Sequence, residues 1–452
     1  MPGNMMRKIL SNYGMVMVLA ALCALFSVLT LKPQVPVGDR AADQVVGRIV
    51  GERQKDDVIL AVGAANKDSG PFAQRVGGEL ERRGFREVRV VVGTPQDLRT
   101  VLDKIREEGK IPAAIATSGD VAQWRLIEVL PEKYPEFTGC RVMTPETYLW
   151  PDFLKASNLL AIVDRIVVIA VIAIGMTLVI ITGGIDLSVG SLTALSAVVA
   201  ALLMKSLGGL GAPGWAVPVG FLAAILCCGL VGGAGGFIVA RFGIAPFITT
   251  LAIMMVGRGL AFLITGGFSI YQVPKALPWL GQGRTLGVPN TVILLVILYA
   301  AAHVFMSHTR WGRYIYAVGG NSEAARLSGV PIRFILVFVY ILSGSAAGLG
   351  GCIQASQLNT GTPNLGVMYE LYVIAAVVVG GTSLSGGSGK ILGTLIGAFI
   401  ISVIQNGMNL LGIESYTQQV VLGLVILGAV LLDKLRGGRG FRPLREEKGS
   451  NR

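Results

Sequence analysis

Residues 159–181 read LLAIVDRIVVIAVIAIGMTLVII, and this run decides the fold class. It is apolar except for the adjacent charges Asp164 and Arg165 and the hydroxyl of Thr177. Because roughly 20 apolar residues in a helix cross about 30 Å of hydrocarbon, the run predicts a membrane-spanning helix. Of the 452 residues, 52% are hydrophobic and 15% are charged, which excludes an ordinary soluble multidomain protein.

Further apolar stretches of similar length occur along the chain. They lie near residues 9–31, 187–205, 215–240, 244–266, 290–307, 334–355, 369–385, 390–412 and 416–433. Long apolar runs favour helices over a barrel, whose strands alternate. We therefore predict an all-α polytopic membrane protein of about ten transmembrane helices.

The segment between the first two predicted spans has a different pattern. Short apolar runs at 58–62, 88–92, 113–116 and 141–143 alternate with helical patterns near 72–83, 95–108 and 121–130. Such alternation predicts a small α/β unit with a mostly parallel sheet. We expect four parts: an N-terminal tail with helix 1 (1–34), an α/β insert (35–152), a membrane domain with helices 2–10 (153–435) and a basic tail (436–452).

The basic excess lies outside the insert. Residues 32–157 carry 19 Lys and Arg against 19 Asp and Glu, so the formal net charge of +12 belongs to the remaining residues. These cations gather in the tail and in predicted loops on the side of the N-terminus. The positive-inside rule then places both termini in the cytoplasm and the insert on the periplasmic or external side. Because the charge follows topology, it argues against nucleic-acid binding.

The sequence offers no catalytic constellation. His303 and His308 stand at the end of one apolar run without a nearby cluster of Cys, Asp or Glu, so a metal site is not expected. Gly389 and Lys390 resemble part of a phosphate loop, but Leu384 replaces its first glycine and Ile391 its Ser or Thr. We expect no catalytic residue, no metal and no cofactor bound by this chain.

Two acidic residues lie where charge is costly. Asp186 follows a glycine pair, and Glu370 opens an apolar run; ionisable groups in a bilayer indicate function by default. The alternatives are a helix N-cap for Asp186 and a first-turn dipole partner for Glu370. Residues 183–191 and 380–388 also share the frame GGxxLSxGS. The candidate pathway or helix-break residues are Gly183, Gly184, Asp186, Ser188, Glu370, Gly380 and Gly381.

The predicted inward loop 308–333 contains a capped-helix signature. Asn321 or Ser322 can cap a short helix, Glu323 suits its positive end, and Gly329 followed by Pro331 ends it. A short helix outside the membrane offers a docking surface to a cytoplasmic partner. The alternative is a solvated connector.

Three motifs carry a family resemblance. They are GMTLVIITGGIDLSVGS (175–191), GRYIYAVGGNSEAARLSG (312–329) and IAAVVVGGTSLSGGSGK (374–390). In this order they resemble the ribose/xylose-type permeases of bacterial, binding-protein-dependent ABC importers. The resemblance implies an inner-membrane subunit with ten helices that forms a homodimer or heterodimer. It also implies two cytoplasmic ATPase subunits and a periplasmic sugar-binding protein as partners.

The resemblance also assigns a role to the capped loop. It implies that this segment is the coupling helix that contacts the ATPase. The residues concerned are Gly320, Asn321, Glu323, Ala324, Ala325, Arg326, Leu327 and Gly329.

The chain departs from the family pattern at two places. Residues 369–377 read YELYVIAAV, with Tyr372 where relatives carry Asp, and the insert replaces a short connection. The alternation of the insert is similar to half of a sugar-binding protein. The insert either docks or replaces part of that protein, or it is a stabilising cap without a ligand.

We therefore expect a permease subunit that moves a monosaccharide by alternating access while a separate subunit hydrolyses ATP. The alternative is a ligand-sensing membrane receptor whose external α/β module remains but whose membrane body no longer transports. An ion-driven carrier is disfavoured, because Asp186 and Glu370 are too few for a proton or sodium relay.

Overall fold

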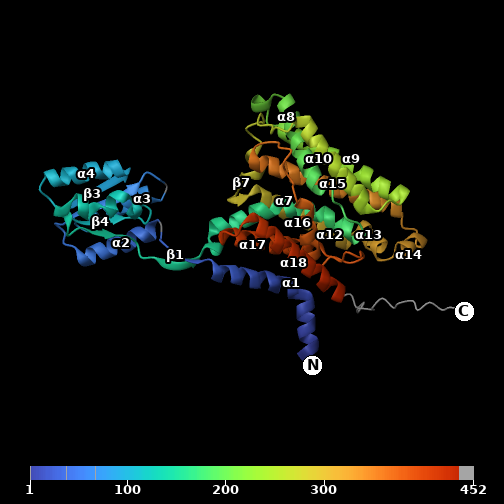
Figure 1. Ribbon diagram of the computed structural model, residues 1–452, viewed down its shortest axis with the longest axis horizontal. Helices are drawn as coiled ribbons and strands as arrows, with labels where there is room; N and C mark the ends of the chain where they lie inside the picture. The colour runs from blue at the N-terminus through green and yellow to red at the C-terminus, as the bar shows by residue number, and fades with distance from the viewer. Residues whose placement is uncertain (1, 37, 67, 437–452) are drawn as a thin grey trace. The chain divides into compact units, whose positions relative to one another are not determined.

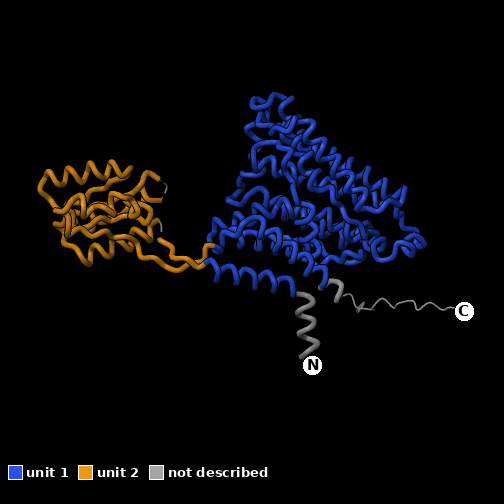
Figure 2. Tube along the Cα trace, viewed as in Figure 1, with its two compact units in different colours: residues 1–30, 153–452 blue, residues 31–152 orange. Residues whose placement is uncertain are grey.

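The computed structural model describes residues 2–36, 38–66 and 68–436, with side chains described from residue 14 to residue 431 of these ranges. It divides into two compact units (Figure 2): unit 1 is formed by Met1–Thr30 with Phe153–Arg452, and unit 2 by Leu31–Asp152. The predicted basic tail, apart from residue 436, lies outside the described residues.

Unit 1 is built from helices. The long ones are α1 (Pro2–Leu29), α7 (Ala156–Ile181), α8 (Val189–Ser206), α9 (Ala216–Phe242), α10 (Pro246–Thr265), α12 (Asn290–His308), α15 (Ile332–Leu358), α17 (Ile391–Leu410) and α18 (Ser415–Arg436). Shorter elements are α11 (Pro278–Gly281), α13 (Arg310–Gly320), α14 (Ser322–Leu327), α16 (Tyr369–Val379), β7 (Arg284–Thr285) and β8 (Val288–Pro289).

Among the described residues, seven helices are long and apolar enough to cross a membrane: α7, α8, α9, α10, α12, α15 and α17. Three shorter apolar helices cover Gly14–Leu29, Tyr369–Val379 and Ser415–Leu431. The chain is therefore a mostly helical, polytopic membrane protein, as expected. The number of ten crossings stays a prediction.

Two features of unit 1 differ from the sequence expectation. Helix α16 ends at Val379 and not near residue 385, because Gly381 adopts the left-handed conformation (φ +82°) that glycine tolerates. The expected inward loop contains a second helix, α13, before α14. Thr309 caps α13 by accepting a hydrogen bond from the backbone N–H of Gly312.

Helix α15 lies at the centre of unit 1, where it packs against α7, α8 and α9 (Figure 1). Glycines on both sides permit the closest of these contacts. A Cβ added to Gly232 of α9 would overlap the carbonyl oxygen of Tyr340, and one added to Gly344 of α15 would overlap that of Cys228. Small residues that bring backbones together are the expected means of helix association in lipid.

Unit 2 is a doubly wound α/β unit. Its parallel sheet has the order β3-β2-β4-β5, and its strands are β2 (Val58–Ala64), β3 (Glu87–Gly93), β4 (Pro112–Thr117) and β5 (Arg141–Met143). Helices α2 (Asp39–Glu52) and α3 (Ser69–Arg82) cover one face, and α4 (Pro95–Glu107) covers the other (Figure 1). A two-stranded antiparallel ribbon of β1 (Leu31–Gln34) and β6 (Tyr148–Pro151) joins the ends of the unit.

The predicted helix at 121–130 is wrong. The segment forms a single 3₁₀ turn at Val121–Gln123 and the short helices α5 (Arg125–Glu128) and α6 (Leu130–Lys133). Trp124 adopts an extended conformation (ψ 130°), which ends the first piece, and Pro131 lies in the first turn of α6. Two further 3₁₀ turns follow at Pro135–Phe137 and Asp152–Leu154.

Candidate functional site: two helix breaks joined to a short surface helix

The first helix break lies between α7 and α8 and is organised by Asp186. This side chain is fully buried, with 0% exposure. Its Oδ1 accepts hydrogen bonds from the backbone N–H of Ser188 (2.9 Å) and from the Ser188 hydroxyl (2.6 Å). Its Oδ2 accepts one from Ser343 of α15 (2.8 Å). Burial of a carboxylate is costly unless it is hydrogen-bonded, so these three donors account for its tolerance here.

The N-cap interpretation of Asp186 is wrong in its simple form. Helix α8 begins at Val189, and Ser188 occupies the N-cap position. Asp186 therefore binds the cap residue instead of the helix N–H groups, and its second oxygen reaches a different helix through Ser343. The residue ties the break to α15, a link that a local cap would not make.

A threonine and a glycine complete the first break. The Thr250 hydroxyl of α10 accepts a hydrogen bond from the backbone N–H of Leu187 (3.1 Å) and lies 3.2 Å from the carbonyl oxygen of Ile185. A Cβ on Gly184 would come within 2.6 Å of the buried Tyr340 hydroxyl. The break is thus held between α10 and α15, with space for glycine only at position 184.

The second break follows α16 and leads into α17. Gly380 ends α16 where a Cβ would lie 2.6 Å from the carbonyl oxygen of Gly393. Further along, the backbone N–H of Gly387 donates a hydrogen bond to the carbonyl oxygen of Ile181 (2.8 Å). A Cβ on Gly386 would also lie 3.1 Å from the nitrogen of Gly183, so the two segments with the shared GGxxLSxGS frame lie against each other.

Helix α13 meets both breaks at its C-terminal end. A Cβ on Gly319 would overlap the carbonyl oxygen of Ile181 and lie 2.7 Å from the nitrogen of Gly387. The Tyr316 hydroxyl donates a hydrogen bond to the carbonyl oxygen of Gly389 (2.8 Å). Gly319 was not among the predicted site residues. Gly319 contacts residues that are far from it in the chain, so the sequence around it does not indicate its role.

Helix α14 follows directly and has the predicted capped form. Asn321 accepts a hydrogen bond from the backbone N–H of Ala324 (3.0 Å), and Glu323 pairs with Arg326 (2.5 Å). The hydrogen bond and charge of Arg326 lower the pKa of Glu323. Gly329, at φ +80°, ends the helix, and Leu327 is 78% exposed. An exposed leucine beside an exposed ion pair forms a small amphipathic surface.

Glu370 lies in the first turn of α16, as expected, but its environment was not foreseen. A Cβ on Gly190 would overlap the Glu370 carboxylate, which places that carboxylate against the first turn of α8. The guanidinium of Arg258 in α10 is close enough to Glu370 for its positive charge to attract the carboxylate. The Arg258 guanidinium donates hydrogen bonds to the carbonyl oxygens of Leu365 (2.5 Å) and Pro363 (3.1 Å).

A non-helical segment, residues 359–368, runs alongside α8. Gly361 packs against Ala197 and Ala201, and Gly366 packs against Gly190 at the start of that helix. In a membrane, irregular backbone is tolerated where protein covers it or where it lines a polar cavity. Sequence reasoning missed this segment, although the composition NTGTPN between two apolar runs is typical of an interruption.

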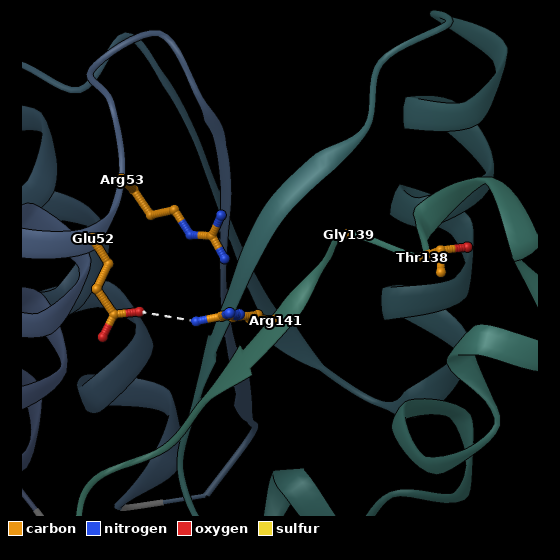
Figure 3. A pocket seen from close by; sticks show the side chains of 5 residues that line it. All are labelled: Glu52, Arg53, Thr138, Gly139 and Arg141. Atoms are coloured by element: carbon orange, nitrogen blue, oxygen red, sulfur yellow. Dashed lines mark ion pairs between the residues drawn. The ribbon is translucent and has the colours of Figure 1, made fainter.

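Unit 2 has a cavity of its own (Figure 3). It encloses about 570 Å³ and is lined by Glu52, Arg53, Thr138, Gly139 and Arg141. Glu52 and Arg141 form an ion pair (3.6 Å), and the Arg53 Nε atom is buried without a hydrogen-bond partner. Arg141 begins β5, and Glu52 and Arg53 precede β2. The cavity therefore lies at the amino edge of the sheet, opposite the edge where doubly wound folds bind ligands.

The carboxyl edge of the sheet is closed by its own side chains. Between β2 and β4, where the strand order reverses, Asn66 (3.1 Å) and the hydroxyl of Ser69 (2.5 Å) donate hydrogen bonds to Asp120. Burial raises the pKa of Asp120, but the nearby Ser118 hydroxyl and the hydrogen bonds from Ser69 and Asn66 outweigh this effect and lower it overall. Asp120 thus remains an ionised acceptor that bridges the two loops.

Metal ligands do not gather in the described ranges, where no group of three or more His, Cys, Asp or Glu is close enough to hold an ion. The rings of His303 and His308 are 6.3 Å apart and have no acidic neighbour in sequence.

Apolar helices of membrane-spanning length, two glycine-rich connections between helices and a further helix, α13, in contact with both connections are typical of a multi-pass membrane permease. The chain belongs to the family described as the permease component of the branched-chain amino acid transport system, which it matches over residues 158–430. This match begins after unit 2. No solved structure matches the chain.

Curated relatives refine this family. Ribose import permease protein RbsC of Escherichia coli (strain K12) is 45% identical over 289 residues, 63% of this chain and 88% of the relative. RbsC of Bacillus subtilis (strain 168) is 43% identical over 287 residues, 63% of this chain and 87% of the relative. D-allose transport system permease protein AlsC of E. coli (strain K12) is 37% identical over 287 residues, 63% and 85% respectively. The resemblance to ribose-type ABC permeases is thus confirmed, and the chain is a multi-pass protein of the bacterial inner membrane.

Proposed function

We propose that this chain is the membrane-spanning subunit of an ABC importer that moves a ribose-like monosaccharide inward by alternating access. The names of the relatives support a pentose or hexose substrate, since they include ribose and D-allose permeases. One observation carries the mechanism: Gly319, three residues before the start of α14, contacts both helix breaks. ATP is hydrolysed by a separate subunit.

The orientation follows from charge. With both termini in the cytoplasm and unit 2 in the periplasm, α13 and α14 face the cytoplasm, and their arginines obey the positive-inside rule. Helix α14 is then accessible to two cytoplasmic ATPase subunits. A periplasmic sugar-binding protein delivers substrate from the other side, and a second permease subunit, identical or related, completes the assembly.

Coupling proceeds through backbone contacts. Pressure from the ATPase on the surface of Glu323, Arg326 and Leu327 moves α14, and Asn321 passes the movement to the end of α13. Because Gly319 touches the backbone at Ile181 and Gly387 without an intervening side chain, both breaks shift with it. The helices that follow the breaks, α8 and α17, then tilt, which opens the pathway to one side at a time.

The pathway itself is assigned to the broken segments. Gly183, Gly184, Asp186 and Ser188 form the first break, and Gly380 and Gly381 the second. Glu370, whose carboxylate lies against Gly190, and Arg258, which donates hydrogen bonds to the carbonyl oxygens of Leu365 and Pro363, lie beside the non-helical segment 359–368. Carboxylate, guanidinium and peptide groups are hydrogen-bonding partners suited to the hydroxyls of a sugar.

Proteoliposomes test this proposal. The chain, reconstituted with its ATPase and binding protein, is expected to accumulate labelled ribose only with ATP. The Gly319→Ala variant is expected to lower accumulation strongly, compared with Gly423→Ala in α18, while both still bind the ATPase. Sugar flux that proceeds without ATP would refute the importer assignment.

A ligand-sensing receptor is the second candidate, and the cavity of unit 2 is the observation that favours it. Calorimetry separates the two functions. A receptor is expected to bind a small ligand through Arg53 and Arg141 in the absence of ATPase and binding protein, and to show no uptake with them.

A further inference from the structure

An apolar cavity of about 370 Å³ lies among four helices of unit 1. Helix α7 contributes Leu178, α9 contributes Ile225, α12 contributes Ala302 and Phe305, and α15 contributes Phe338. Ser345 is the one lining residue with a hydroxyl. Because α7 packs against both α12 and α15 and contributes lining residues, it forms the floor of a groove between them.

The cavity reaches toward the end of the bundle that carries α13. Phe305 lies three residues before the end of α12, Leu178 three residues before the end of α7, and Phe338 six residues after the start of α15. The rings of Phe305 and Phe338 are 6.2 Å apart and join the two walls. The groove therefore ends at an aromatic pair near the predicted membrane surface.

Trp311 continues this aromatic pair outward. Its ring lies 6.0 Å from Phe338 and 5.5 Å from Phe334. The Arg310 guanidinium lies over the Trp311 ring, 5.3 Å from its centroid. Tryptophan favours the level of lipid headgroups, so its position at the mouth of an apolar groove marks the boundary between chain and headgroup.

Three exposed cations are near this mouth in the sequence: Arg310 precedes Trp311, Arg313 follows it two residues further along α13, and Arg333 precedes Phe334. None of them takes part in an ion pair recorded for the described residues. In the sequence from 303 to 338 the single acidic residue is Glu323, which pairs with Arg326. The mouth thus carries positive charge without a carboxylate to balance it.

We propose that this site binds an anionic phospholipid. One acyl chain occupies the apolar groove, the phosphate lies among Arg310, Arg313 and Arg333, and Trp311 packs at the level of the glycerol. Basic pockets between membrane helices suit acidic headgroups. A second copy of this chain fits less well, because a two-fold axis passing through the groove would bring the three arginines toward their own counterparts. Only the assignment to the cytoplasmic leaflet depends on the orientation proposed above.

Fluorescence of Trp311 tests the site in the full chain. A single-tryptophan form, with Phe at positions 124, 150, 215 and 279, is reconstituted in phosphatidylcholine with a few per cent of brominated phosphatidylglycerol or brominated phosphatidylcholine. Brominated phosphatidylglycerol is expected to quench Trp311 at much lower mole fraction. Equal quenching by the two lipids would overturn the proposal, and so would absence of quenching by either, since protein would then cover the face.

Two pairs of variants make the test specific. Since a basic residue near the surface contributes about five-fold in lipid affinity, Arg310→Gln and Arg333→Gln are each expected to weaken phosphatidylglycerol quenching by about that factor. Arg241 also lies over an aromatic ring, that of Phe242, and Arg241→Gln is expected to leave phosphatidylglycerol quenching unchanged. Ala302→Phe fills the groove and is expected to remove the preference, whereas Ala300→Phe, exposed on the same helix, is not. Retained preference in Ala302→Phe would exclude the acyl chain from this cavity.

Discussion

The backbone N–H of Gly387 donates a hydrogen bond to the carbonyl oxygen of Ile181, the last residue of α7. The bond joins the connection after α16 to the end of α7, more than two hundred residues away in the chain. Gly319 covers it from the side of α13. A movement at one break is therefore felt at the other without a change in side-chain packing between them.

Gly319→Ala is expected to impair coupling strongly. Its methyl group would overlap the Ile181 carbonyl, and overpacking of this kind costs about 1–3 kcal/mol. If the displaced contact raises the barrier of the transport cycle by a similar amount, ATP-dependent uptake in proteoliposomes should fall by about ten-fold or more, since about 1.4 kcal/mol corresponds to a factor of ten in rate. Gly423→Ala in α18, with no atom within 4 Å of the new methyl, is the matched control. Equal activity of the two variants would contradict the proposed relay.

Charge reversal on α14 is expected to release the ATPase. Glu323→Arg and Arg326→Glu each place like charges together on the exposed surface, and copurification with the ATPase should be lost. Because a fully exposed ion pair contributes little to the stability of a helix, unfolding would not explain the loss. The double exchange restores the pair with reversed order and should fold normally. ATPase binding that survives both single variants places the dock elsewhere.

Removal of the Asp186 carboxylate is expected to destabilise unit 1. Asp186→Ala leaves the Ser343 hydroxyl, the Ser188 hydroxyl and the Ser188 N–H without their acceptor, and each buried unsatisfied group costs about 1–3 kcal/mol. Ser343→Ala removes one bond and should lower the melting temperature less. Asp186→Asn keeps a carbonyl acceptor and serves as the control. If Asp186→Ala melted at the wild-type temperature, Asp186 would not contribute to the stability of unit 1.

The stability of unit 2 is expected to fall in acid partly through Asp120. Its folded-state pKa is below that of the unfolded chain, so its contribution is full above the unfolded value, about 4, and is lost as pH falls through the folded value. Tryptophan fluorescence of the whole protein between pH 6 and 2, followed at Trp124, measures this. The free energy of unfolding of Asp120→Asn should depend less steeply on pH than that of the wild type over this range. Asp68→Asn, at an exposed neighbour, should follow the wild type. Identical slopes for all three proteins would exclude Asp120 as a source of acid sensitivity.

Deletion of unit 2 decides between its two roles. Gln34 and Tyr148 are paired across the β1–β6 ribbon, so residues 35–147 can be replaced by Asn-Gly, which favours a tight hairpin. If unit 2 is a cap, uptake should saturate at the same low sugar concentration as in the wild type. A higher half-saturating concentration at unchanged maximal rate is expected if it docks or replaces part of the binding protein.

Periodicity predicted much of this fold. The four strands of unit 2 lie where short apolar runs were recognised, and the long apolar helices of unit 1 follow the predicted stretches. Helix α2 was missed because its buried face consists of Ala41, Ala42, Val45, Val46 and Ile49 within a strongly charged segment that also contains two glycines. Small apolar residues give a weak periodic signal, yet they bury completely against α3.

The site was only partly predictable, because its contacts are long-range. Asp186 was identified from its cost in a membrane, but its partner Ser343 is 157 residues away. Gly319 and Arg258 depend in the same way on helices that meet in space, and no local rule distinguishes them from other glycines and arginines. By contrast, the caps of α14 use residues within a few positions of one another, so Asn321 and Gly329 could be assigned from sequence alone.

The β1–β6 ribbon brings together the two ends of unit 2, which matters for engineering this chain. Leu31 and Pro151 stand opposite each other, so the polypeptide departs and comes back at neighbouring points. A domain whose two ends lie next to each other can be inserted into another domain without rearranging the fold of that domain. A fluorescent reporter or another binding domain could therefore be inserted at the β1–β6 ribbon in place of unit 2.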